Sequence, residues 1–154
     1  RRGDSAGFAM IVREAEPCDV ARAVAIWRAA VDATHRFLSP DDRQEIDAQV
    51  SEFLAQSPFW VAECGADIVG FMVMDADMIE ALFVDPTSHG QGVGSALVAH
   101  ALAIAPRARV DANEQASNAV PFYLARGFEP IGRSERDGQG RPYPIVHFRF
   151  PAES

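Results

Sequence analysis

Apolar side chains in the N-terminal third of the chain recur with a helical period. Between Val20 and Val31 they are spaced three and four residues apart, which predicts an amphipathic helix beginning near Pro17. A second helix is predicted from Ser39, whose hydroxyl can cap it, with Pro40 at the first helical position. The apolar face expected for this second helix consists of Ile46, Val50, Phe53 and Leu54.

The pattern then changes to short apolar runs separated by turn residues, which is typical of β-strands. Strands are predicted over 59–62, 68–74 and 78–84, and a short strand over 11–13 precedes the first helix. Because the turns between the three later runs are only a few residues long, these strands are expected to pair antiparallel.

Two helices and three strands are predicted in the rest of the chain. A helix over 93–104 is followed by a strand over 107–111, an order that favours a parallel crossover. A shorter helix stops at Gly127, and strands are expected over 128–132 and 145–150. In the helix over 93–104, the residues expected to be buried are Val93, Ala96, Leu97, His100, Ala101 and Ile104. This mixture of helices and strands predicts an α/β protein in the broad sense, and within that sense the α+β class.

Length and composition narrow the class of protein. The 154 residues suit one domain, expected over 10–154, whereas 1–9 lack periodicity and are expected to be a tag remnant or disordered. The net charge of −8 argues against nucleic acid as a partner and favours cationic acceptors such as amines. No apolar run approaches the length of a membrane span. Cys18 and Cys64 have no metal or disulfide spacing, which indicates free thiols and a cytoplasmic protein.

Three alternate glycines, Gly90, Gly92 and Gly94, directly precede the helix predicted over 93–104. The first N–H groups of a helix are unpaired and carry partial positive charge, and glycine lets an anion approach them closely. The loop lacks the lysine of a P-loop, and its G-x-G-x-G spacing and antiparallel context differ from a dinucleotide fingerprint. The motif therefore predicts a site for a phosphate-like anion, with a flexible turn as the alternative.

Two motifs in this sequence resemble the GCN5-related N-acetyltransferase (GNAT) superfamily. The pyrophosphate motif of that family, Gln/Arg-x-x-Gly-x-Gly/Ala, is similar to residues 89–94. A later family motif is similar to Asn113 followed by the aromatic and glycine positions of 119–128. Within the superfamily, segments 31–35, 37–39, 113–115 and 140–144 resemble the YjaB-like bacterial acetyltransferases.

The resemblance implies a mixed, mostly antiparallel sheet that is splayed between its fourth and fifth strands and flanked by about four helices. It also implies acetyl-CoA as co-substrate. Two positions depart from the family pattern, since His89 replaces Gln or Arg and Ala116 stands where Asn is frequent. The residues implied to contact the cofactor are Leu82, Phe83, Val84, His89, Gly90, Gln91, Gly92, Val93, Gly94, Ser95, Asn113 and Tyr123.

For catalysis, the resemblance implies direct transfer of an acetyl group to a primary amine in a ternary complex. Glu80 interrupts an apolar strand and is the candidate base, and the alternative is an exposed strand-face glutamate. Tyr123 is the candidate acid that protonates the leaving thiolate, and the alternative is a core aromatic. A catalytically silent acyl-CoA-binding regulatory module remains the competing function.

The acceptor site is expected on or after the first predicted helix. Its candidate residues are Trp27, His35, Phe37 and Tyr143, with core packing as the alternative for Trp27 and His35. Protein lysine and small amines both remain open as acceptors. No set of residues has metal-ligand spacing, so no metal is expected, and a homodimer is suggested only by analogy with the family.

Overall fold

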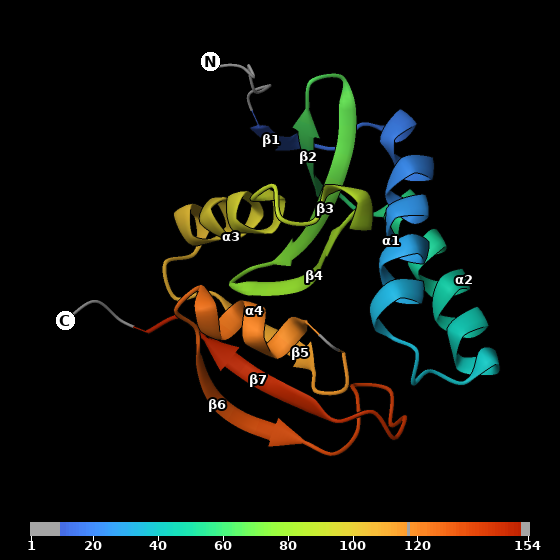
Figure 1. Ribbon diagram of the computed structural model, residues 1–154, viewed down its shortest axis with the longest axis vertical. Coiled ribbons are helices and arrows are strands. Elements are labelled where there is room, and N and C mark those ends of the chain that lie inside the picture. Colours follow the sequence, from blue (N-terminus) through green and yellow to red (C-terminus); the bar gives the residue numbers. More distant parts are fainter. Residues whose placement is uncertain (1–9, 117, 152–154) are drawn as a thin grey trace.

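The computed structural model describes residues 10–116 and 118–151, so the predicted tag remnant lies outside the described residues. Its centre is a seven-stranded sheet with the strand order β1-β2-β3-β4-β5-β7-β6 (Figure 1). All neighbouring strands pair antiparallel except β4 and β5, which are parallel. The strands are β1 (Met10–Glu14), β2 (Trp60–Cys64), β3 (Asp67–Asp75), β4 (Met78–Val84), β5 (Arg109–Asn113), β6 (Glu129–Ser134) and β7 (Ile145–Arg149).

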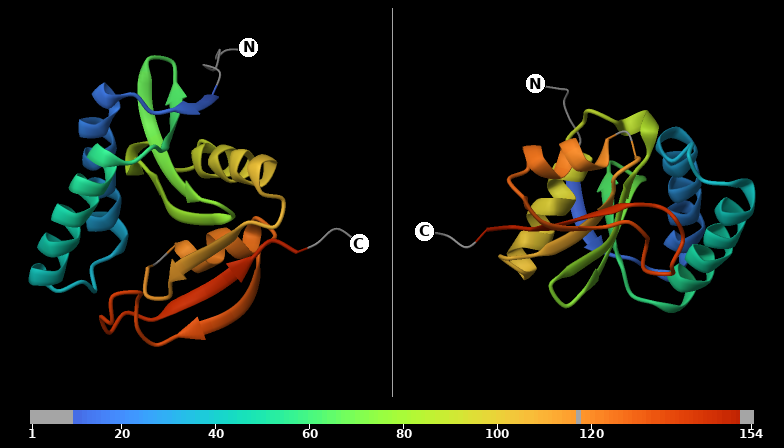
Figure 2. Two further views of the ribbon diagram at one scale, coloured as in Figure 1. Left: turned by 180° about the vertical axis from the view of Figure 1, so that it is seen from behind. Right: turned by 90° about the horizontal axis from the view of Figure 1, so that it is seen from below.

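Two pairs of α-helices cover the two faces of this sheet, as Figure 2 shows from below. Helices α1 (Val20–Thr34) and α2 (Pro40–Gln56) pack on one face, over a core that includes Val61, Phe71 and Val73. Helices α3 (Val93–Ile104) and α4 (Ala119–Ala125) pack on the other face. Within the described residues no helix is both long enough and apolar enough to cross a membrane.

The two N-terminal helices begin where the capping residues predict. Pro17–Asp19 form a short 3₁₀ turn that leads into α1, and the Ser39 hydroxyl accepts a 3.1 Å hydrogen bond from the Asp42 N–H at the start of α2. The apolar face expected for α2 is wrong at one position, because Phe53 is 47% exposed whereas Leu54 is buried. Phe53 lies just before Leu54, on a side of the helix that faces away from the core.

Helix α3 packs deeply against the sheet, but the predicted stripe needs one change. Val93, Leu97 and Ala101 are buried as expected, and Val98 is buried as well. Ile104 is 48% exposed, because it is the last helical residue and lies one turn beyond the last buried position. The strand after α3 also begins two residues later than predicted, at Arg109.

The parallel pair β4–β5 confirms the splayed fold. The two strands pair only through Met78 with Arg109 and Ile79 with Val110. Beyond these pairs β4 continues to Val84 and β5 to Asn113 without pairing each other, so the sheet opens between them (Figure 1). This opening positions the site described next.

Candidate active site

A cleft of about 970 Å³ lies where β4 and β5 separate. Its volume is at the upper end of the range typical of small-molecule sites, roughly 300–1,000 Å³. Its lining comes from the end of α1, the strands β4 and β5, the loop before α3, and helix α4. The predicted site residues that line it are His35, Glu80, Leu82, Phe83, Val84, His89, Gly90, Gly92, Val93, Gly94, Ser95, Asn113 and Tyr123.

Glu80 reaches this cleft because β4 contains a bulge. Opposite β3, Val73 pairs with Ala81 and Met74 pairs with Ile79, which leaves Glu80 as the extra residue. A bulge bends the strand and redirects the extra side chain. Ile79 is buried in the core under α3, and the Glu80 side chain is exposed at the cleft wall. Glu80 is thus an exposed strand residue that also lines the cleft, and its role as the base stays a prediction.

A second carboxylate, Asp111 on β5, also lines the cleft and was not singled out from the sequence. It lies on β5 one residue beyond Val110, as Glu80 lies one residue beyond Ile79 on β4. Asp111 is held by His147 of the neighbouring strand at 2.7 Å, and the other ring nitrogen of His147 is 2.7 Å from the Ser134 hydroxyl. Both carboxylates belong to residues that line the cleft.

The glycine loop has the backbone geometry that an anion site needs. Gly90 and Gly92 adopt left-handed conformations with φ of 86° and 81°, and nothing lies within 4 Å of a Cβ placed on either. Gly92 is the N-cap of α3, so the first N–H groups of that helix face the loop. Gln91 belongs to the loop but is exposed and does not line the cleft.

Arg126 contributes a positive charge to the loop end of the cleft, and the sequence analysis missed it. It follows α4 directly, its guanidinium donates to the Ser95 hydroxyl, and its Cζ lies 5.1 Å from the centre of the Phe122 ring. Within residues 10–116 and 118–151, no carboxylate forms an ion pair with it. The sequence feature that could have pointed to Arg126 is its position directly before Gly127, because Gly127 ends helix α4 and α4 packs against the loop.

Tyr123 is buried at the centre of the molecule but still lines the cleft. Its ring packs against Phe122, Phe128 and Phe148 at centroid distances of 5.0–6.0 Å. Burial raises the pKa of its phenol above the ordinary value, because the phenolate would be desolvated. Tyr123 is therefore a core aromatic that also lines the cleft, and its role as the acid stays a prediction.

On the α1 side, His35 and Thr34 form the cleft wall. Thr34 donates its hydroxyl proton to the Ala30 carbonyl at 2.7 Å, so its oxygen can only accept from His35 Nδ1, also at 2.7 Å. Burial lowers the pKa of His35 to about 4, which keeps the ring neutral near pH 7. The second ring nitrogen, Nε2, is then a hydrogen-bond acceptor.

The remaining acceptor candidates separate into two groups. Phe37 lies 5.3 Å from His35 and 5.7 Å from Tyr143, measured between ring centres, so these three form one aromatic row. Tyr143 is buried, donates to the Asp42 carboxylate and accepts from the Ser39 N–H, which fastens the β6–β7 loop to the start of α2. Trp27 instead lies in the core under α1, 3% exposed and away from the cleft. Trp27 is therefore a core residue, as the packing alternative predicted.

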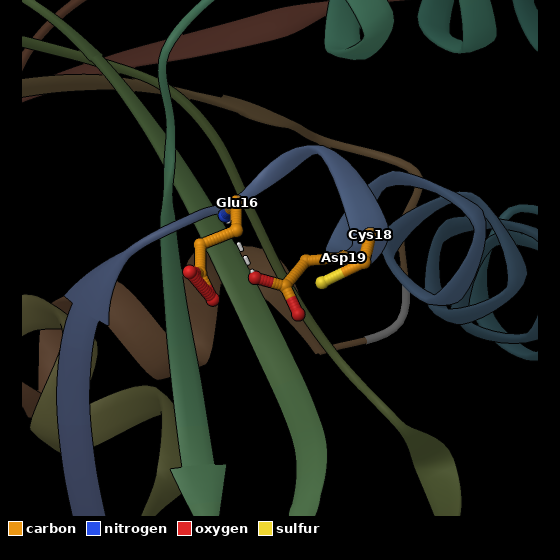
Figure 3. Close-up of side chains that lie close together, drawn as sticks. All are labelled: Glu16, Cys18 and Asp19. Atoms are coloured by element: carbon orange, nitrogen blue, oxygen red, sulfur yellow. Dashed lines mark hydrogen bonds between the residues drawn. The ribbon is translucent and has the colours of Figure 1, made fainter.

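One group of possible metal ligands comes together among the described residues, at Glu16, Cys18 and Asp19 (Figure 3). The Asp19 carboxylate accepts a 2.8 Å hydrogen bond from the Glu16 N–H and forms an ion pair with Arg13 at 2.9 Å. These contacts explain the cluster as a capping box at the entry to α1. It lies outside the cleft lining.

The family model of the Acetyltransferase (GNAT) domain matches residues 55–130, which include the glycine loop and Tyr123. The peptidyl-lysine N-acetyltransferase YjaB of Salmonella typhimurium (strain LT2) is 48% identical over 129 residues, covering 83% of this chain and 89% of the relative. The chain belongs to the GNAT acetyltransferase family.

Other comparisons place this GNAT chain beside the same relatives. YjaB of Escherichia coli (strain K12) is 47% identical over 128 residues, covering 82% of this chain and 87% of the relative. The solution structure of apo YjaB from Escherichia coli matches with a TM-score of 0.89 and 41% identity, covering 94% of this chain and 99% of that one. The predicted superfamily, the likeness to YjaB and the α/β GNAT fold are therefore confirmed.

A more distant GNAT structure shares the fold alone. The PaiA N-acetyltransferase of Thermoplasma acidophilum, solved in complex with coenzyme A, has a TM-score of 0.72 and 17% identity, covering 90% of this chain and 98% of that one. GNAT acetyltransferases use acetyl-CoA as acetyl donor, and the predicted enzyme class, an N-acetyltransferase, is confirmed by the family match and the relatives.

Proposed function

We propose that this chain transfers the acetyl group of acetyl-CoA directly to the side-chain amine of a protein lysine. The observation that carries the proposal is the single cleft in which an anion-binding loop, a buried tyrosine and two carboxylates meet. The peptidyl-lysine activity named for the YjaB relatives supports a lysine acceptor over a small amine.

The cofactor half of the cleft is the side of the glycine loop. The free N–H groups at the start of α3 suit the pyrophosphate of acetyl-CoA. The edge of β4 from Leu82 to Val84 is unpaired toward β5, so the amide groups of the pantetheine arm can bond to it like an added strand. His89 supplies less positive charge than arginine at the first loop position, and Arg126 stands where it can make up the difference.

The chemistry needs an unprotonated amine, a stabilised oxyanion and a protonated leaving group. A free lysine has a pKa of about 10.4, so Glu80 would accept its proton directly or through water. The amine nitrogen then attacks the thioester carbonyl, and a backbone N–H of the unpaired β4 edge can donate to the oxyanion. As the carbon–sulfur bond breaks, Tyr123 gives its proton to the sulfur. Burial raises the pKa of the Tyr123 phenol, which keeps the proton on Tyr123 until the thiolate forms.

His35 and the row formed with Phe37 and Tyr143 would hold the acceptor. The Nε2 of His35 can accept a hydrogen bond from the lysine amine, and the row borders the aliphatic part of the side chain. The β6–β7 loop, fastened to α2 through Tyr143, would form the outer border of this half of the site.

The test is thiol release from acetyl-CoA with a panel of lysine peptides and small primary amines, with acetylated products identified by mass spectrometry. Turnover with lysine peptides and little with small amines is the expected result. Tight coenzyme A binding without turnover on any acceptor would support the regulatory module instead, and failure to bind coenzyme A would contradict both functions.

A further inference from the structure

A smaller cavity of about 370 Å³ opens beside the active-site cleft. Ala33 and Thr34 line both cavities, so the smaller one adjoins the cleft at the end of α1. Its other lining residues are Arg36 and Phe37, from the turn after α1, and Gln115, from the turn after β5. The cavity therefore lies between the turn after α1 and the turn after β5, next to the side of the cleft proposed to hold the acceptor.

Both turns are held in place by backbone and side-chain hydrogen bonds. The Leu38 N–H donates to the His35 carbonyl at 3.2 Å, which closes a turn with Arg36 at its first corner. The Gln115 N–H donates to the Asn113 side chain at 3.0 Å, and the neighbouring Glu114 N–H donates to the Pro144 carbonyl at 2.9 Å. The lining is thus a built surface that presents one cationic and one amide side chain.

Arg36 is the uncompensated charge of this entrance. The nearby acids are already engaged, since Asp32 pairs with Arg43 at 2.9 Å and Glu114 pairs with Arg133 at 2.8 Å. In the described part of the chain, Arg36 itself forms no ion pair. An exposed guanidinium that forms no ion pair can bind a carboxylate with two parallel hydrogen bonds.

The charged residues that line the two cavities differ. The inner cleft has the carboxylates of Glu80 and Asp111, with Arg126 at its loop end, whereas the charged residue that lines the outer cavity is Arg36. A lysine side chain that reaches into the cleft leaves its backbone at the entrance, and neighbouring residues of an extended peptide are only about 3.3 Å apart along the chain. A residue next to the acceptor lysine would therefore lie beside Arg36 and Gln115.

We propose that the cavity at Arg36 is a subsite for an aspartate or glutamate adjacent to the acceptor lysine. This inference rests on the proposed lysine acetyltransferase function and specifies its substrate class. The guanidinium of Arg36 pairs with the acidic side chain, the Gln115 amide bonds to the peptide backbone, and Phe37 covers the lysine stem. The subsite selects among lysines without taking part in the chemistry.

The test measures kcat/KM for a peptide set with one lysine, in which each flanking position in turn is Glu, Gln or Arg. At low salt, Glu at one position is expected to exceed Gln by about 2- to 5-fold, the size of an exposed ion pair, and the advantage should shrink at high salt. Arg36→Glu should reverse the order of the Glu and Arg peptides. Arg107→Glu is the matched control, because Arg107 is also exposed and lines neither cavity.

The outcomes separate the subsite from the activity. Acetylation that is insensitive to the flanking residue, or equal effects of Arg36→Glu and Arg107→Glu, would overturn the subsite and leave the lysine acetyltransferase intact. Acetylation of no peptide, with coenzyme A still bound, would instead overturn the proposed function, and the subsite with it.

Discussion

Thr34 fixes the tautomer of His35. The threonine hydroxyl gives its proton to the Ala30 carbonyl, so the 2.7 Å contact with His35 Nδ1 is a bond from the imidazole to the threonine oxygen. The lone pair of His35 is thereby left on Nε2, at the wall of the cleft. A neutral imidazole of this kind is a fixed hydrogen-bond acceptor for an amine.

This arrangement predicts a pH-dependent contribution of His35 to stability. The folded pKa is about 4 and the unfolded value about 6.5, so only the unfolded chain takes up the proton between them. The wild-type protein should lose stability as the pH falls through this window, by at most about 3 kcal/mol. His35→Gln removes the titrating group and should lack this loss.

The effect is measured by urea unfolding of wild type and His35→Gln at pH 7.5 and pH 4.5. The contributions of the protein's carboxylates cancel in the difference between the two proteins, because both proteins contain them. Relative to wild type, the variant should have a higher free energy of unfolding at pH 4.5 than it has at pH 7.5. An equal difference at both would show that His35 is not held in its neutral form.

Gly94 allows α3 and α4 to approach each other. A Cβ at this position would lie 2.9 Å from Cζ of Phe122, closer than real contacts allow. Gly94→Ala should therefore displace the Phe122 ring, lower the free energy of unfolding by about 1 kcal/mol and weaken coenzyme A binding. Gly138→Ala is the control, because its Cβ would meet no atom within 4 Å. Equal stability and affinity of the two variants would argue against the close contact.

Arg126 should contribute to cofactor affinity through the phosphates of coenzyme A. Arg126→Gln is expected to weaken coenzyme A binding about 10-fold at low salt, the size of one charge-assisted hydrogen bond. Calorimetry with coenzyme A and with its 3′-dephospho form shows which phosphate is involved, since only the pyrophosphate is common to both. Arg107→Gln should bind normally, and His89→Arg should restore part of the loss. Unchanged affinity of Arg126→Gln would remove Arg126 from the site.

Patterns within single elements were readable from the sequence. The glycines of 90–94 and the strand that precedes them line the cleft or lead into it, because helix starts follow from local spacing. Tyr123, which also lines the cleft, was predicted from the resemblance to the family. The splay between β4 and β5 was predicted from the resemblance to a family, because no local sequence pattern indicates where two parallel strands stop pairing.

Features that depend on the register between strands were not readable. The bulge that redirects Glu80 is defined by its partners Val73 and Met74 on β3. Asp111 meets His147 only because β5 and β7 pair in that register. Arg126 was not predicted for a related reason. Its contact with Ser95 joins two helices, and how closely these helices approach is set by tertiary packing.

The position of Tyr123 in the cleft is the centre of this account, and Tyr123→Phe tests it most directly. The variant keeps the packing against Phe122, Phe128 and Phe148 but loses the proton that the leaving thiolate needs. We predict that kcat for acetylation of a lysine peptide falls about 100-fold, within the range for general acid catalysis, while the Kd for coenzyme A changes little. An unchanged kcat with normal coenzyme A binding would contradict the role of Tyr123 as the acid.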